Sequence, residues 1–341
     1  MRLRKSGGAS VLATLFSIAM IGLAAPAVLA QGPRAPDKVH VGYQALASYT
    51  PLFQGIEKGY FREQGLDVTF TRFSTGGRMS LPLANGEIDV GGDQLSPAMV
   101  NSMATGVGTK VVAGRGRMPL EPGKGTSALV IRGDLADQIR TPADLKGRTM
   151  LLIAPGSPHL FFLGEYFRRF GFTEDDMQYK YMQFPNMPLA LMNKQADAAY
   201  IVEPFGLKAV ELGAKVLARA GDIAPGAVVS VLQYSGAFIK RPAVAQKFMN
   251  AYIQGARYFN RPEYREDNAA ILSKWSKVPK EVILKLDFVT VEADGEVNRK
   301  SIDEQLAWFY KKGLVKTLVT SADIVDTRFV DEANRVIGGH R

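Results

Sequence analysis

Short runs of β-forming residues alternate with amphipathic stretches along the chain from Val39 onward, and Gly and Pro residues separate them. The first run, residues 39–43, alternates apolar and polar side chains, and Thr50-Pro51 then has the pattern of a helix start with proline at the first helical position. Repetition of this order is typical of α/β units that build a mostly parallel sheet. Because 341 residues exceed the usual limit of one hydrophobic core, the sequence predicts an α/β protein with two lobes.

One stretch of the chain nearly repeats itself at a domain-sized spacing. Residues 83–90 and 191–198 share Leu, Asn and Asp in register. Only two copies exist, so they predict a helix, a tight turn and a strand in each lobe rather than a solenoid. Asp89 and Asp197 are predicted turn residues, because Asp side chains commonly bond nearby backbone groups there; a functional carboxylate pair is the alternative.

The two predicted lobes share the chain unevenly. We assign residues 38–126 and 235–341 to the first lobe and residues 127–234 to the second. The chain then crosses between lobes twice, near Gly125 and near Ser235, and two crossings make a hinge. Pro82 conflicts with the helical pattern before Asn85, so either that helix starts near Leu81 or the loop at residues 76–77 is longer.

Residues 1–30 have the pattern of a secretory signal peptide. Arg2, Arg4 and Lys5 precede an apolar run at residues 11–23, and small residues lead to a predicted cleavage site after Ala30. The run is shorter than the roughly 20 residues that span a bilayer, which disfavours a membrane anchor. The chain has no Cys, so a lipoprotein anchor and thiolate metal sites are excluded. We expect a soluble periplasmic protein.

Charge and missing motifs exclude several function classes. The chain has 42 Lys+Arg and 33 Asp+Glu, but beyond the signal peptide no Lys/Arg run is longer than two, so nucleic acid is not an expected partner. The three His residues do not form a metal-protease motif, and nucleophile-elbow, phosphate-loop and dinucleotide motifs are absent. We therefore expect no enzyme, no cofactor and no metal site. Catalysis by a carboxylate pair is the alternative that the sequence leaves open.

Polar and Gly-rich loops fall at predicted strand ends and helix starts, where open α/β sheets bind ligands. Capping of a helix start is the alternative for Ser157 and Glu203, and a surface position is the alternative for His159. Arg115 or Arg117, in a predicted Gly/Arg/Pro loop, would suit an anion. The predicted ligand contacts are Gln44, Ser48, Tyr49, Thr75, Gly76, Gly77, Asp93, Gln94, Ser127, Ser157, His159, Asn186 and Glu203.

The order and spacing of several motifs resemble the periplasmic binding proteins for nitrate, sulfonate, taurine and thiamine-precursor pyrimidines. The resemblance covers nearly all of the chain after the signal peptide. It implies a type 2 periplasmic-binding-protein fold, a ligand cleft between the lobes, and delivery of solute to the permease of an ABC importer. The motifs are Gly42-Tyr43-Gln44, Glu57-Lys58-Gly59-Tyr60-Phe61, Gly65-Leu66-Asp67-Val68, residues 85–91, Asp197-Ala198-Ala199 and Glu203-Pro204-Phe205.

The expected function is the binding of a small organic nutrient, a sulfonate, carboxylate or related anion, by a monomer that closes its cleft. If Glu203 instead faces the cleft, its carboxylate would favour a ligand with N–H donors, such as taurine or a thiamine-precursor pyrimidine. An exported enzyme or a sensor on the same fold is the second alternative. Eukaryotic relatives that make the thiamine pyrimidine carry a Cys-rich motif, which this chain lacks.

Overall fold

The computed structural model describes residues 35–338, and the predicted signal peptide lies outside them. From Pro36 onward the described residues belong to one compact unit. Within this part of the chain, no helix is both long and apolar enough to cross a membrane.

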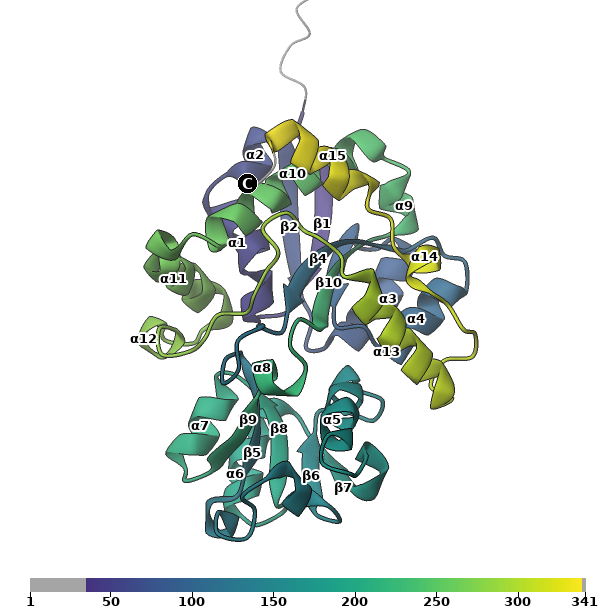
Figure 1. Cartoon of the computed structure of the whole chain (residues 1–341). Helices are drawn as coiled ribbons and strands as arrows, with labels where there is room; N and C mark the ends of the chain where they lie inside the picture. Colours follow the sequence, from purple (N-terminus) through teal and green to yellow (C-terminus); the bar gives the residue numbers. More distant parts are fainter. Residues whose placement is uncertain (1–34, 339–341) are drawn as a thin grey trace, which may run out of the picture. The chain divides into compact units, whose positions relative to one another are not determined.

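The described residues form two mixed five-stranded sheets (Figure 1). The first has the order β2-β1-β3-β10-β4, in which β1 runs parallel to β2 and β3, and β10 runs antiparallel to β3 and β4. The second has the order β7-β6-β8-β5-β9, in which β6 is parallel to β7 and β8, and β5 is antiparallel to β8 and β9. The strands are β1 Asp37–Tyr43, β2 Leu66–Arg72, β3 Val90–Asp93, β4 Lys110–Arg117, β5 Ser127–Ile131, β6 Thr149–Leu152, β7 Gln178–Tyr181, β8 Ala198–Val202, β9 Lys215–Arg219 and β10 Val228–Tyr234.

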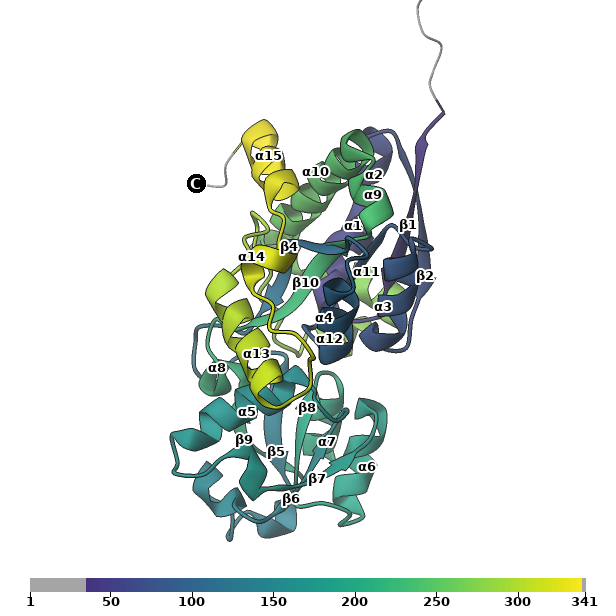
Figure 2. The same ribbon diagram turned by 90° about the vertical axis from the view of Figure 1, so that its right-hand side faces the viewer.

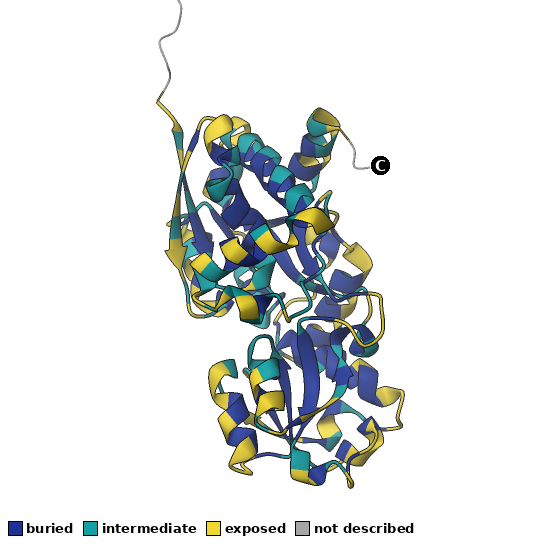
Figure 3. Cartoon of the chain, turned by 90° about the vertical axis from the view of Figure 1, so that its left-hand side faces the viewer, coloured by how far each residue is buried: buried dark blue, intermediate teal, exposed yellow. Residues whose placement is uncertain are grey.

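Helices flank both sheets, and the predicted α/β class is confirmed. The long α10 packs against α1, α2 and α15 beside the first sheet. Buried positions follow the sheets and the inward helix faces, whereas exposed residues lie on the outer helix faces (Figure 3). The helices are α1 Thr50–Glu57, α2 Tyr60–Glu63, α3 Gly76–Asn85, α4 Pro97–Ala104, α5 Pro158–Arg168, α6 Met187–Met192, α7 Phe205–Glu211, α8 Ala220–Ile223, α9 Gly236–Ile239, α10 Pro242–Phe259, α11 Arg265–Ser276, α12 Lys280–Ile283, α13 Arg299–Lys311, α14 Ser321–Ile324 and α15 Arg328–Ile337.

Helix α13, from the last part of the chain, lies against α5, which follows β6 of the second sheet (Figure 2). Trp308 on α13 packs its ring 6.0 Å from that of Phe161 and donates its indole N–H to Glu174 Oε1 at 3.1 Å. A single buried apolar cluster includes Met99 beside the first sheet together with Phe161 and Trp308. The two sheets therefore share part of one hydrophobic core.

Strand β10 belongs to a different sheet from the one that the predicted lobe boundary at residue 235 implies. That boundary places β10 in the second lobe, but β10 pairs with β3 and β4 of the first sheet. The return crossing therefore lies before Val228. The sequence of an apolar strand does not indicate which sheet it joins, because that is decided by pairing with strands distant in the sequence. The division into lobes otherwise stays a prediction.

Two local predictions, one at a helix start and one inside a helix, need correction. Thr50 does not cap α1; its hydroxyl donates to the carbonyl oxygen of Ala47 at 2.7 Å. Pro82 lies inside α3, which begins at Gly76, so neither predicted way of avoiding it is correct. Helix α13 is capped by Asn298, whose side chain accepts from the Ser301 amide.

Asp89 and Asp197 occupy matching turns before β3 and β8, as the near-repeat predicts. A carboxylate oxygen of Asp89 accepts from the His40 amide at 2.9 Å, and Asp89 donates its own amide to the His40 carbonyl at 2.8 Å. Asp197 makes the same two bonds with Thr149, at 3.0 and 2.9 Å. Each Asp thus ties a turn to a neighbouring strand, and the two carboxylates belong to different sheets.

Candidate functional site

Gln44 and Asp93 meet where β1 and β3 end, because parallel neighbours finish at the same edge of a sheet. The Gln44 amide donates to Asp93 Oδ1 at 3.1 Å. The Asp93 carboxylate lies against Gly76, where an added Cβ would fall 1.4 Å from Oδ2, so only glycine fits there. Burial raises the pKa of Asp93 above its ordinary value.

Arg115 is a buried cation behind this edge of the sheet. Its guanidinium lies 3.7 Å above the ring of Tyr49 and donates from Nη1 to Ser48 Oγ at 2.8 Å. The Tyr49 hydroxyl donates to the Gly92 carbonyl oxygen, and burial raises the pKa of Tyr49 to about 12. Arg115 is only 1% exposed and makes no salt bridge within the described residues. A buried charge is costly unless it is compensated, and the Tyr49 ring supplies part of that compensation.

A second polar cluster lies where β5 begins and β8 and α5 meet. The Ser157 hydroxyl accepts from the His159 amide at 3.3 Å, and the same oxygen lies 3.0 Å from His159 Nδ1. The His159 ring centre is 4.8 Å from that of Tyr200, whose hydroxyl is 2.7 Å from Ser127 Oγ. His159 is only 2% exposed, and burial lowers its pKa to about 4. The imidazole is therefore neutral at pH 7.

Gln94 joins the two clusters. It follows β3 of the first sheet, and its Nε2 lies 3.0 Å from His159 Nε2 at the start of α5. The Gln94 amide nitrogen can only donate, so His159 Nε2 accepts this hydrogen bond. The single N–H proton of the neutral imidazole is therefore on Nδ1, which donates it to Ser157 Oγ. Hydrogen bonds from Gln94 through His159 to Ser157 thus connect the loop after β3 of the first sheet with the start of α5.

The remaining predicted residues lie in other surroundings. Thr75 precedes α3 without a side-chain capping bond, and Gly77 and Asn186 are exposed. Glu203 Oε2 accepts from the Leu207 amide at 2.7 Å, and Oε1 lies 3.5 Å from Arg219 Nη1. Glu203 therefore caps α7, as the capping alternative predicts, and its charge is compensated within the protein.

Two residues that sequence reasoning misplaced or missed belong to the clusters. Arg115 lies inside β4 rather than in the predicted loop, since β4 extends to Arg117 by pairing irregularly with β10. Tyr200 contacts both Ser127 and His159, but nothing in its apolar strand sets it apart from a core tyrosine. Among the described residues, no group of three His, Cys, Asp or Glu side chains could hold a metal ion.

Solved structures share this fold. The alkanesulfonate-binding protein SsuA from Xanthomonas axonopodis pv. citri, bound to MOPS, has a TM-score of 0.67 and 20% identity, covering 86% of this chain and 99% of that one. The nitrate-binding protein NrtA from Synechocystis PCC 6803 has a TM-score of 0.69 and 15% identity, covering 89% of each chain. The desulfurization enzyme DSZB has a TM-score of 0.62 and 14% identity, covering 89% of this chain and 100% of that one.

These likenesses confirm the expected periplasmic-binding-protein fold. Because proteins with this fold include both solute-binding proteins and an enzyme, the fold alone does not decide between binding and catalysis. No curated protein matches the chain. A family model matches residues 32–273, more than half of the sequence, and the chain therefore belongs to the NMT1-like family.

Proposed function

We propose that the protein is a periplasmic solute-binding protein that delivers a small organic anion, a sulfonate or carboxylate, to an ABC importer. The observation that carries this proposal is the hydrogen bond between Gln94 and His159, which links a polar cluster at each sheet. The structures of SsuA and NrtA support it, since their names describe binding of alkanesulfonate and nitrate on the same fold.

The charges around the clusters favour an anion. Arg115 is a buried cation without a salt bridge within the described residues. Glu203, which would repel an anion if it faced the ligand, is occupied by Leu207 and Arg219. Asp93 opposes this preference, although its carboxylate already accepts a hydrogen bond from the Gln44 amide. The uncharged donors that remain, hydroxyls and amides, suit sulfonate or carboxylate oxygens.

Closure of the cleft would form the Gln94–His159 bond, and opening would break it. Neither residue is charged at pH 7, so breaking the bond exposes no uncompensated ion. A ligand that contacts both clusters would bind the closed form better and shift the population toward it.

The test is a thermal-shift screen of the protein from Gln31 onward, unfolded and refolded beforehand to remove bound ligand. Compounds are MOPS, ethanesulfonate, taurine, benzoate, nitrate and an aminopyrimidine. A ligand at about 100 times its Kd should add ~2.7 kcal/mol to the free energy of unfolding. Stabilisation by ethanesulfonate supports the proposal, as does stabilisation by benzoate that is lost in Gln94→Ala. Stabilisation by none of the compounds, or by the aminopyrimidine alone, contradicts the proposed ligand class.

Variants and turnover separate binding at this site from the alternatives. Gln94→Ala should weaken the best ligand at least tenfold, whereas Gln178→Ala removes the same amide from an exposed position on β7 and should change nothing. Mass spectrometry of each compound after prolonged incubation should find no product. Product formation would instead favour an enzyme, and ATPase and permease genes beside this gene would favour import.

A further inference from the structure

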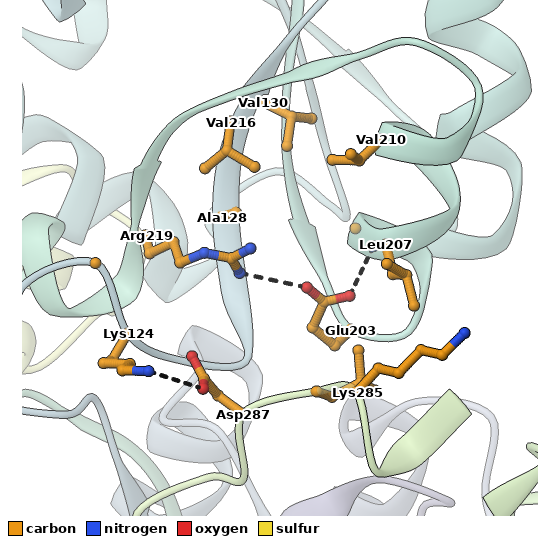
Figure 4. Close-up of a pocket in the computed structure, with 13 residues that line it drawn as sticks. Lys124, Ala128, Val130, Glu203, Leu207, Val210, Val216, Arg219, Lys285 and Asp287 are labelled. Atoms are coloured by element: carbon orange, nitrogen blue, oxygen red, sulfur yellow. Dashed lines mark hydrogen bonds and ion pairs between the residues drawn. The ribbon is translucent and has the colours of Figure 1, made fainter. Parts of the chain in front are cut away.

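A separate cavity of about 290 Å³ lies beside the second sheet. Figure 4 shows Arg219 and Glu203 side by side at its centre, valine side chains above them, and Lys285 and Asp287 below. The side chains come from β5, β9 and α7 on one side and from the segment after α12 on the other. Apolar side chains form most of one wall: Ala128, Val130, Leu207, Val210 and Val216.

This cavity is on the opposite face of the second sheet from His159. Side chains alternate between faces along a strand. In β5, Ser127 faces Tyr200 of the His159 cluster, whereas Ala128 and Val130 pack with the apolar cluster on the α6 and α7 side and line the cavity. The sheet itself therefore separates the two places.

The charges in the cavity wall leave an excess of one cation. Glu203 is engaged by the Leu207 amide and by Arg219. Asp287 accepts from the Gly125 amide at 2.9 Å and lies 3.7 Å from Lys124 Nζ. Three cations (Lys124, Arg219 and Lys285) thus face two anions, and Lys285 makes no salt bridge within residues 35–338.

We propose that this cavity is a second binding site, for a small organic anion with an apolar body such as an aromatic carboxylate. The valine and leucine side chains would bury the apolar part of the ligand. Lys285, which makes no salt bridge within the described residues, would pair with the ligand's carboxylate. The volume, at the lower end for ligand pockets, restricts the occupant to a compact molecule. A ligand here would contact both the second sheet and the segment after α12.

The experiment titrates the protein with benzoate and with benzyl alcohol, its neutral counterpart, and follows saturation by ligand-observed NMR and calorimetry. Saturable benzoate binding should weaken at least tenfold in Val216→Trp, which fills the cavity from an edge strand, and severalfold in Lys285→Ala. Matched controls are Val336→Trp on α15 and Lys300→Ala on α13, both at exposed positions, which should leave affinity unchanged. Benzyl alcohol should bind at least tenfold more weakly than benzoate.

Binding at the other site gives a different result. Gln94→Ala should leave this benzoate site intact, because it lies across the sheet. Benzoate binding that is lost in Gln94→Ala but kept in Val216→Trp would overturn the second site while supporting the proposed function. The absence of saturable binding up to 10 mM, on the order of the weakest specific affinities, would also overturn it. If Val216→Trp does not fold, judged by circular dichroism, Val210→Trp fills the same wall.

Discussion

The buried His159 predicts that acid destabilises the protein through one identifiable group. Burial lowers its folded-state pKa to about 4, whereas an unfolded His titrates near ~6.5. The stability that depends on a neutral His159 is fully present above the unfolded-state pKa, and it is lost as the pH falls from about 6.5 toward 4. Proton linkage then gives a loss of roughly 2 kcal/mol between pH 8 and pH 5, and about 3 kcal/mol in the limit.

A second buried group titrates in the opposite direction over the same pH range. Burial raises the pKa of Glu292 from 4.5 to about 7, so its contribution is fully present below 4.5 and is lost as the pH rises through 7. The wild-type pH profile therefore hides the effect of His159. The informative quantity is the difference in unfolding free energy between wild type and His159→Gln, because Glu292 contributes equally to both.

The assay is urea unfolding of wild type and His159→Gln at pH 8 and pH 5, analysed by linear extrapolation. Glutamine keeps a side chain that accepts from Gln94 but cannot bind a proton in this range. We expect the advantage of wild type over the variant to shrink by roughly 2 kcal/mol at pH 5. A difference that is the same at both pH values, within the roughly 10–15% uncertainty of the extrapolation, would refute the reasoning.

Three further predictions follow from buried contacts. As the pH falls from 8 to 5, the Glu292 carboxyl, with a pKa of about 7, contributes a gain of roughly 2 kcal/mol to the free energy of unfolding. The same urea titrations should show that Glu292→Gln has lost this contribution. Gly76→Ala should cost about 1–3 kcal/mol because its Cβ would overlap the carboxylate at the end of β3, whereas Gly77→Ala, with open space around it, should be neutral or stabilising in thermal melts. Trp308→Phe leaves the buried Glu174 without its indole donor and should cost about 1–3 kcal/mol, also by thermal melts; an unchanged Tm would contradict this.

Local signals in the sequence predicted much of the fold. Proline after a small polar residue marked the start of α1, Ser157 caps α5 as the capping alternative predicts, and the repeated Asp marked matching turns. The helix starts depend on neighbours within a few residues, so a local pattern was enough to find them. The turns were found from the repeat, although the bonds that Asp89 and Asp197 make go to strands that are distant in the sequence.

The rest depended on contacts between distant segments. The run of Gly and Arg residues after Ala113 reads as a loop, but pairing with β10 makes it part of β4 and buries Arg115. The bond between Gln94 and His159 joins residues 65 positions apart, and no periodicity in the chain indicates it. The predicted ligand contacts at both ends of that bond remain predictions.

The position of β10 between β3 and β4 in the first sheet also determines the order in which the protein can be completed during synthesis. All five strands of the second sheet are consecutive, from β5 to β9. All of them are therefore available for pairing once Arg219 has left the ribosome. The first sheet needs β10, which is the only strand that pairs with β4 among the described residues. Until Val228–Tyr234 is available, β4 presents unpaired backbone groups, which are a template for pairing with other chains. A nascent chain that stops short of residue 228 would therefore carry a finished second sheet beside an aggregation-prone strand.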